Sequence, residues 1–171
     1  MTTRLLDAIH AYDTGYIAAD AERDFRRMRR HRRWAQLVRR LRQTCDRSTR
    51  LAVFADATAG RSATAQRNLG LQAVDLDTIV GSVGRAHDFD NRFRPGRAIS
   101  ERRWEALDRA MRSGESIPPI IVYRVDGLHY IQDGHHRVSA AKAVGWESVD
   151  AFVTEVLTTT PTTPTATARA A

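Results

Sequence analysis

Residues 130–145 have the sequence YIQDGHHRVSAAKAVG, in which an apolar strand end, a polar turn and a short helix follow one another. Gly134 allows a sharp turn, because glycine adopts backbone conformations that other residues avoid, and Gly145 is a typical helix end. A turn that leads directly into a helix points unpaired backbone N–H groups and the positive end of the helix dipole at one spot. The stretch therefore predicts a binding corner for an anion such as phosphate.

The side chains of this turn suit an anionic ligand. Arg137 offers a planar fork of donors that matches phosphate or carboxylate oxygens. His135 and His136 add ring donors that strengthen when the imidazoles are protonated. A simpler interpretation stays open, in which Asp133 and Gly134 form an ordinary tight turn with solvated side chains around it.

Between about residue 74 and residue 156 the chain resembles the ParB/sulfiredoxin superfamily. Members share a first strand, an apolar strand that contains proline, a Gly-x-x-Arg turn and an Ala-rich helix, and the turn is the most specific of these motifs. The matching pieces here are residues 74–80, 117–125, 134–137 and 138–144. The resemblance implies an α+β fold with a small mixed sheet and packed helices, preceded by an N-terminal helical extension.

Chromosome-partitioning ParB proteins of this superfamily hold a nucleoside triphosphate, typically CTP with magnesium, at the turn and the following helix. Carried over by motif, the phosphate contacts would come from Gly134, His135, His136 and Arg137, with Ser139 on the same helix. ParB proteins continue into a helix-turn-helix domain and a dimerisation domain. A polar tail stands at that point here, so we do not expect recognition of a DNA site through that module, although the resemblance still allows a homodimer.

Two other branches of the superfamily suggest different chemistry. Sulfiredoxins would place their catalytic cysteine at His135, which excludes sulfinic-acid reduction through that thiol. Free serine kinases are similar across the turn and imply a phosphotransferase that uses ATP or ADP. There Asp133 or Asp88 would act as base or metal ligand, while His136 and Arg137 stabilise charge on the phosphoryl group. Hydrolysis of a nucleoside triphosphate, and a noncatalytic interaction module with a purely structural turn, are further alternatives.

A loop crowded with polar side chains follows residue 80. By position it matches the loop after the first strand of ParB-like proteins, which lies beside the nucleotide or substrate. The resemblance therefore adds Ser82, Arg85, His87 and Asp88 to the candidate site. The alternative is an ordinary surface loop held in place by two phenylalanines.

The net charge of +7 is concentrated in one segment. Residues 21–50 contain twelve arginines against three acidic residues, and the rest of the chain is slightly acidic. Arginines on every side of a predicted helix cannot be buried, so they stay solvated or bind DNA or another polyanion. The residues concerned are Arg26, Arg27, Arg29, Arg30, Arg32 and Arg33. Trp34 could stack on a base, but its place in an apolar stripe with Leu37, Val38, Leu41 and Cys45 favours core packing.

The chain divides into four segments. Residues 1–50 are expected to form a basic helical extension, with helices over 3–19 and from 21 to 45, followed by a connector over 51–73 with at most a short helix. The domain spans 74–157, and the Thr/Pro/Ala tail over 158–171 is expected to be disordered. Within the domain the patterns predict strands over 74–80, 117–125, 128–132 and 149–156, a hairpin turn at Asp126-Gly127, and a helix between Ser100 and Gly114.

Some kinds of site and location are excluded or disfavoured. A single cysteine, Cys45, rules out an intramolecular disulfide and a multi-cysteine metal site, and its place on the apolar stripe favours a buried thiol. Zinc at His129, His135 and His136 is disfavoured because adjacent ligands rarely converge on one ion, so no metal site is expected. No signal peptide or membrane span is recognisable, which makes the cytoplasm the default location.

Overall fold

The computed structural model describes residues 16–41 and 50–159. Its helices and mixed sheet confirm the α+β class. In chain order the elements are α1 (Ile17–Leu41), β1 (Ala52–Val53), α2 (Phe54–Thr58), β2 (Ser62–Asp75), the 3-10 helix η2 (Leu76–Thr78), β3 (Ile79–Ser82), α3 (Glu101–Arg112), β4 (Ile120–Val125), β5 (Leu128–Asp133), α4 (His135–Val144) and β6 (Ser148–Thr159).

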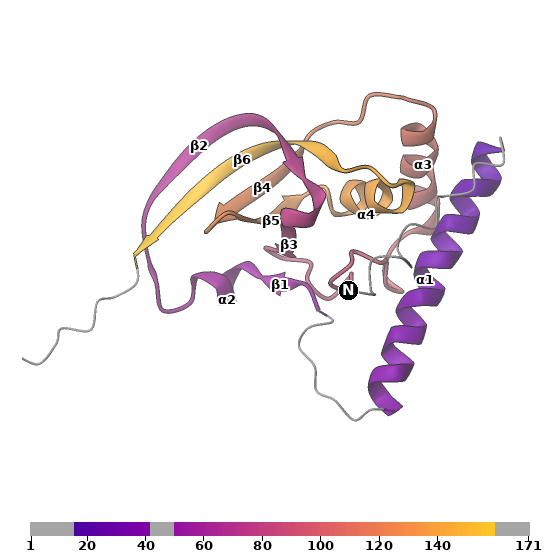
Figure 1. Ribbon diagram of the computed structural model, residues 1–171, viewed down its shortest axis with the longest axis horizontal. Coiled ribbons are helices and arrows are strands. Elements are labelled where there is room, and N and C mark those ends of the chain that lie inside the picture. Colours follow the sequence, from indigo (N-terminus) through magenta and orange to yellow (C-terminus); the bar gives the residue numbers. More distant parts are fainter. Residues whose placement is uncertain (1–15, 42–49, 160–171) are drawn as a thin grey trace, which may run out of the picture.

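The six strands form one sheet in the order β1-β3-β5-β4-β6-β2. Strands β1, β3 and β5 run parallel to one another, β4 is antiparallel to β5 and parallel to β6, and β2 is antiparallel to β6. Figure 1 shows β2 and β6 as a long, curved pair. Strand β5 lies between β3 and β4 in the sheet and is followed directly by α4. The predicted anion-binding turn is therefore at the end of an interior strand.

The predicted hairpin turn and the predicted ends of the helix between Ser100 and Gly114 are confirmed. The hairpin between β4 and β5 turns at Asp126 and Gly127, whose φ angles of 50° and 80° fit a type I′ turn. Helix α3 begins at Ser100, whose hydroxyl accepts a hydrogen bond from Arg103 N–H at 3.4 Å, and it is followed by Gly114 with φ 72°.

The predicted connector over residues 51–73 is wrong. It contains β1, α2 and most of β2, which pairs with β6 from Ser62 to Asp75. Strand β2 lies at the edge of the sheet, and residues 65–68 are all exposed, so the apolar alternation of a half-buried strand is missing there. The single strand predicted over 74–80 is also interrupted, because the Asp75 carboxylate accepts from Asp77 N–H at 2.7 Å and starts η2 before β3 begins.

At the C-terminal end, β6 continues to Thr159, so residues 158 and 159 belong to the sheet rather than to a disordered tail. The rest of the predicted tail lies outside the described residues, as do Cys45 and nearly all of the helix expected over residues 3–19. No helix in the described ranges is long and apolar enough to cross a membrane.

The helices are layered on the sheet. Figure 1 shows α4 beside the sheet, α3 next to it and α1 outermost, and α3 contacts both of the others. The largest apolar cluster joins these helices to the strands; in it the rings of Phe25 from α1 and Trp104 from α3 have centroids 5.4 Å apart. A smaller cluster lies around Tyr130 and Val156, with Phe54 of α2 packed against it. Helix α4 therefore supports α3, and α3 in turn supports α1.

Helix α1 packs through a different face from the one predicted. Phe25 is fully buried and Met28 packs against the core, whereas Trp34 is 61% exposed and Leu37 is 48% exposed. Trp34 follows Phe25 by nine residues, about two and a half helical turns, and therefore points to the opposite side. The prediction that Trp34 packs in the core is wrong.

Ionic contacts hold α1 against α3. Arg112 bridges the buried carboxylates of Asp24 on α1 and Asp108 on α3, and the bond from Arg112 Nε to Asp108 measures 2.8 Å. Burial is the largest influence on Asp108 and raises the pKa of its carboxyl group. The N-terminal half of α1 is thus anchored by both aromatic packing and paired charges.

Candidate functional site

The first turn of α4 starts at Gly134, which is the N-cap residue and has φ 109°. A Cβ atom there would lie 2.3 Å from Cγ2 of Ile120, so space and backbone conformation both require glycine. Glycine has no side chain to cap the helix, and the first backbone bond runs from Val138 N–H to the Gly134 carbonyl at 3.0 Å. The N–H groups of residues 135–137 therefore have no acceptor within the helix, which is the arrangement that binds anions.

His135 fastens the loop after β3 to α4. Its Nε2 lies 2.7 Å from the hydroxyl oxygen of Ser82, and that oxygen accepts a hydrogen bond from Arg85 N–H at 2.8 Å. The His135 ring stacks on Phe89, with the ring centroids 5.9 Å apart. Burial, followed by the charge of Arg85, lowers the pKa of His135 to about 4. The imidazole is therefore neutral near pH 7, with its Nε2 free to accept from the Ser82 hydroxyl. The stronger donors that protonation would give this ring are therefore not present near pH 7.

Arg137 closes the other side of the turn. Its Nη1 donates to the carbonyls of Pro118 at 2.9 Å and Pro119 at 2.6 Å, and its Nη2 pairs with the carboxylate of Asp133. The guanidinium thus ties the segment before β4 to α4. Its positive charge stays beside the helix N-terminus, but most of its donors already have acceptors.

His136 lies among several cations. Its ring is half-buried and packs edge-on to Phe89. Burial, followed by the charges of Arg85 and Arg103, lowers the pKa of His136. Arg137 acts in the same direction, while Asp88 opposes it. The lowered pKa favours the neutral form of His136, and the surroundings of its ring are positive.

Arg103 is a candidate that the sequence did not suggest. It lies in the first turn of α3, and its side chain is exposed. The Arg103 side chain has no hydrogen bond or ion pair among the described residues, whereas Arg85 pairs with Asp88 at 2.7 Å. Only the contact of α3 with α4 brings Arg103 within electrostatic reach of His136, and no local pattern encodes that contact.

The remaining candidates are used in different ways. Ser139 is fully buried and accepts from Trp104 Nε1–H at 2.8 Å, so its hydroxyl links two helices. The side chain of His87 is exposed, while its carbonyl, like that of Asp88, receives the guanidinium of Arg32. The turn and the loop after β3 are thus brought together as predicted, but Ser139 faces the core.

The arginines of α1 are not equivalent. Arg32 is half-buried and donates to the carbonyls of residues 87, 88 and 94 at 2.6–3.2 Å. Arg26 pairs with Glu22, Arg27 pairs with Asp24 at 3.1 Å, and Arg29 lies 5.6 Å from the ring of Phe25. The side chains of Arg30 and Arg33 are exposed and make no hydrogen bond or ion pair with the described residues. Arg32 is therefore a structural clamp, and the outward-facing charge lies on its neighbours.

Candidate metal ligands do not gather into a cluster of three or more within the described ranges. Nδ1 of His129 lies 2.9 Å from the Thr78 hydroxyl, and His135 is held by Ser82, so these two histidines have separate partners. The carboxylates nearest the turn, Asp133 and Asp88, are each paired with an arginine.

Comparison with known proteins places the chain in a family. A 65-residue segment, 38% of this chain, is 34% identical to a nucleoid occlusion protein of Halalkalibacterium halodurans and covers 23% of that protein, so the chain spans less than a quarter of this relative. A crystal structure of sulfiredoxin from Arabidopsis thaliana shares 22% identity with a TM-score of 0.38, covering 48% of this chain and 82% of the other. The family model of the ParB N-terminal domain matches residues 67–167, more than half of the sequence, and the chain therefore belongs to the ParB N-terminal domain family.

Proposed function

We propose that this ParB-family chain binds a nucleotide by its phosphates at the N-terminus of α4, with CTP, ATP or ADP and magnesium as the expected ligands. The observation that carries the proposal is the uncapped first turn at Gly134, surrounded by the positive side chains of Arg85, Arg103 and Arg137. Backbone donors, the helix dipole and guanidinium groups all favour the same kind of ligand.

Arg103 can reorient toward the ligand, since its side chain is exposed and holds no ion pair among the described residues. Magnesium would arrive with the phosphates, and each adjacent carboxylate would have to leave its arginine to reach it.

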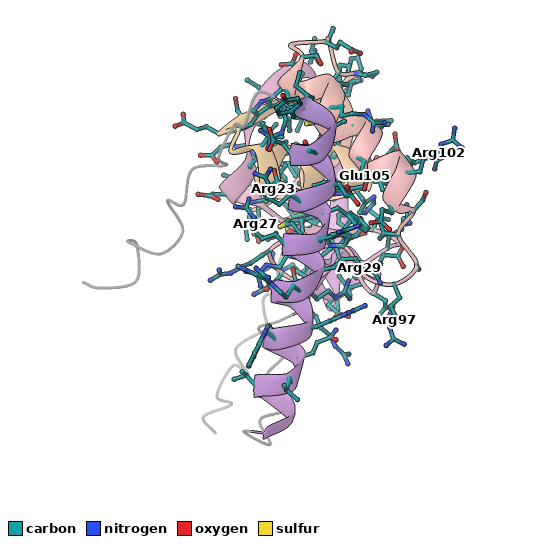
Figure 2. The ribbon with its side chains drawn as sticks, turned by 90° about the vertical axis from the view of Figure 1, so that its right-hand side faces the viewer. Arg23, Arg27, Arg29, Arg97, Arg102 and Glu105 are labelled. Carbon is teal, nitrogen blue, oxygen red and sulfur yellow. The ribbon has the colours of Figure 1, made fainter. Side chains whose placement is uncertain are left out.

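The test is a calorimetric titration of CTP, ATP, GTP and ADP, each with magnesium, into wild type, Arg103→Ala and Arg102→Ala. A charge-assisted bond to phosphate is worth about 1.5–3 kcal/mol, so Arg103→Ala should weaken binding by roughly ten- to a hundredfold. Arg102 is the matched control, because it is exposed on the same helix and projects away from α1 in Figure 2. Equal affinities of all three proteins, or no heat with any nucleotide, would remove the proposal.

A second candidate function is binding of DNA or another polyanion through α1. The observation in its favour is the exposure of Arg30 and Arg33 beside the unburied ring of Trp34. Phosphate neutralisation releases counterions, so the affinity for DNA should fall steeply as salt rises. Neutralising Arg30 and Arg33 together should reduce the slope of log affinity against log salt by about two. An unchanged slope in the double variant would contradict this function.

Phosphotransfer, nucleotide hydrolysis and a homodimer stay predictions. A catalytic base would have to be Asp133 or Asp88, and both carboxylates are ion-paired in the free protein. Nucleotide turnover that is lost in Asp133→Asn while binding persists would support the phosphotransferase alternative.

A further inference from the structure

Two cavities meet beside α1. The smaller, about 500 Å³, is lined by Arg30, His31, Trp34 and Arg94. The larger, about 1010 Å³, has three of these residues in its lining as well, and it extends to Lys142 and Trp146 at the C-terminal end of α4. Because the cavities share lining residues, they form one continuous depression, which we call the α1 trough.

One section of the α1 trough is strongly positive. Arg27, Arg30, Arg92 and Arg94 all line it and all act on His31. Burial is the largest cause that lowers the pKa of His31, and these four arginines lower it further. Four guanidinium groups therefore lie within electrostatic reach of a single imidazole, although Arg27 and Arg94 also have carboxylate neighbours.

The acidic lining residues lie at the other end of the trough. They are Asp75, Asp77 and Glu147, and Lys142 lies 3.6 Å from the carboxylate of Asp77. An anionic ligand would avoid that end. The arginine section, which opens toward Trp34, is where phosphates would be stabilised.

Trp34 gives this positive section an aromatic platform. With 61% of its surface exposed, its indole ring is available to a planar partner. Proteins that bind single strands combine a positive groove for the backbone with aromatic rings on which bases stack. A duplex keeps the faces of its bases inside its own stack, whereas a single strand exposes them.

We propose that the α1 trough binds single-stranded nucleic acid, with backbone phosphates along the arginine section and a base stacked on Trp34. The proposal rests on the polyanion function of α1 and names the class of polyanion. Figure 2 shows Arg23 and Arg27 on one flank of α1 and Arg29 on the other. The trough lies on the Arg27 flank, and Arg33, one turn after Arg29, lines neither cavity.

The test measures fluorescence anisotropy of a labelled oligothymidine of about twelve nucleotides, a matching oligouridine and a duplex of the same length. Wild type should bind the single strands more tightly than the duplex. Trp34→Ala should weaken single-strand binding by roughly tenfold, because stacking is worth about 1–3 kcal/mol per base. Arg30→Ala should weaken binding and reduce the salt slope by about one.

Two matched variants separate the trough from general effects of removing a side chain. Leu37→Ala truncates an exposed apolar residue of the same helix, and Arg102→Ala removes an exposed arginine of α3 that lines neither cavity; both should stay within about twofold of wild type. In addition, the NMR pKa of His31 should rise when oligothymidine binds, since phosphates offset the arginine charges around it.

The outcomes distinguish this inference from the functions proposed above. Duplex binding as tight as single-strand binding, with Trp34→Ala unchanged, would overturn the single-strand site while leaving polyanion binding in place. Binding to anionic phospholipid vesicles with none to any oligonucleotide would overturn both. Neither result would touch nucleotide binding at α4, which the calorimetric titration decides separately.

Discussion

At the scale of single residues, Gly134 is the position on which the candidate site depends most. Alanine there would need φ near 109° and would bring its Cβ within 2.3 Å of Ile120. Left-handed backbone costs about 1–2 kcal/mol, and overpacking costs about 1–3 kcal/mol more. Gly134→Ala should therefore lower the free energy of unfolding by roughly 2–5 kcal/mol, measured in urea.

Gly145→Ala is the matched control for that measurement. Gly145 has φ 94°, and a Cβ there would meet nothing within 4 Å, so only the backbone cost applies. Alanine at Gly145 should cost roughly 1–2 kcal/mol. Equal losses in the two variants would mean that the contact with Ile120 does not matter.

What could be predicted at this scale was whatever depends on a few adjacent residues. Gly134 and the Asp126-Gly127 turn were found because their conformations are set locally. The neutral, clamped state of His135 could not be predicted, because it depends on Ser82 and Phe89 from the loop after β3. Arg103 was missed for the same reason, since α3 approaches α4 only in the folded chain.

At the scale of elements, the attachment of α1 to α3 relies on Arg112. Arg112→Met should leave the carboxylates of Asp24 and Asp108 buried without their shared cation, which costs about 3–5 kcal/mol. We expect lower stability and faster amide hydrogen exchange along α1. Arg102→Met, an exposed change on the same helix, should stay within about 0.5 kcal/mol of wild type.

Adding Asp24→Asn and Asp108→Asn to Arg112→Met should recover a large part of the loss, because the uncompensated charges are then removed. A single Arg112→Met variant with wild-type stability and exchange would show that aromatic packing alone anchors α1. In that case the ion pairs would be incidental to the fold.

The helical character of α1 was predictable, but its buried face was not. Apolar periodicity pointed to Trp34 and Leu37, whereas the packed face contains Phe25 and the clamp residue Arg32. A polar or charged side chain can lie on the inner face when carbonyls accept its donors. A pattern that counts only apolar residues therefore chooses the wrong side.

At the scale of the whole molecule, the α+β class and the central hairpin followed from the sequence, while the edge of the sheet did not. Residues 65–68 of β2 are exposed and show no apolar alternation, so the sequence predicts a connector there. The pairing of β2 with β6 from Ser62 to Asp75 is seen only in the structure. An edge strand with polar outward residues is a common protection against unwanted pairing. It also removes the periodic signal on which strand prediction depends.

The stability of the whole protein should fall as the pH drops from neutral. Folding lowers the pKa of His31, His129, His135 and His136, in each case mainly through burial. The unfolded chain takes up protons on these imidazoles near pH 6.5, and the folded chain resists doing so, which for His135 holds down to about pH 4. Between these limits the unfolded state binds more protons, so acid favours unfolding. Asp108, whose pKa is raised, acts in the opposite direction.

For His135 alone the shift corresponds to a loss of roughly 2 kcal/mol at about pH 5 relative to about pH 7.5. Urea unfolding of wild type and His135→Gln at the two pH values measures it. Glutamine can bond to Ser82 but does not titrate, so the variant should lose less stability on acidification than wild type. Equal losses of stability on acidification in wild type and His135→Gln would mean that the ring between Ser82 and Phe89 is solvated and free to protonate. The loop after β3 would then not be held against α4 in the way the nucleotide site requires.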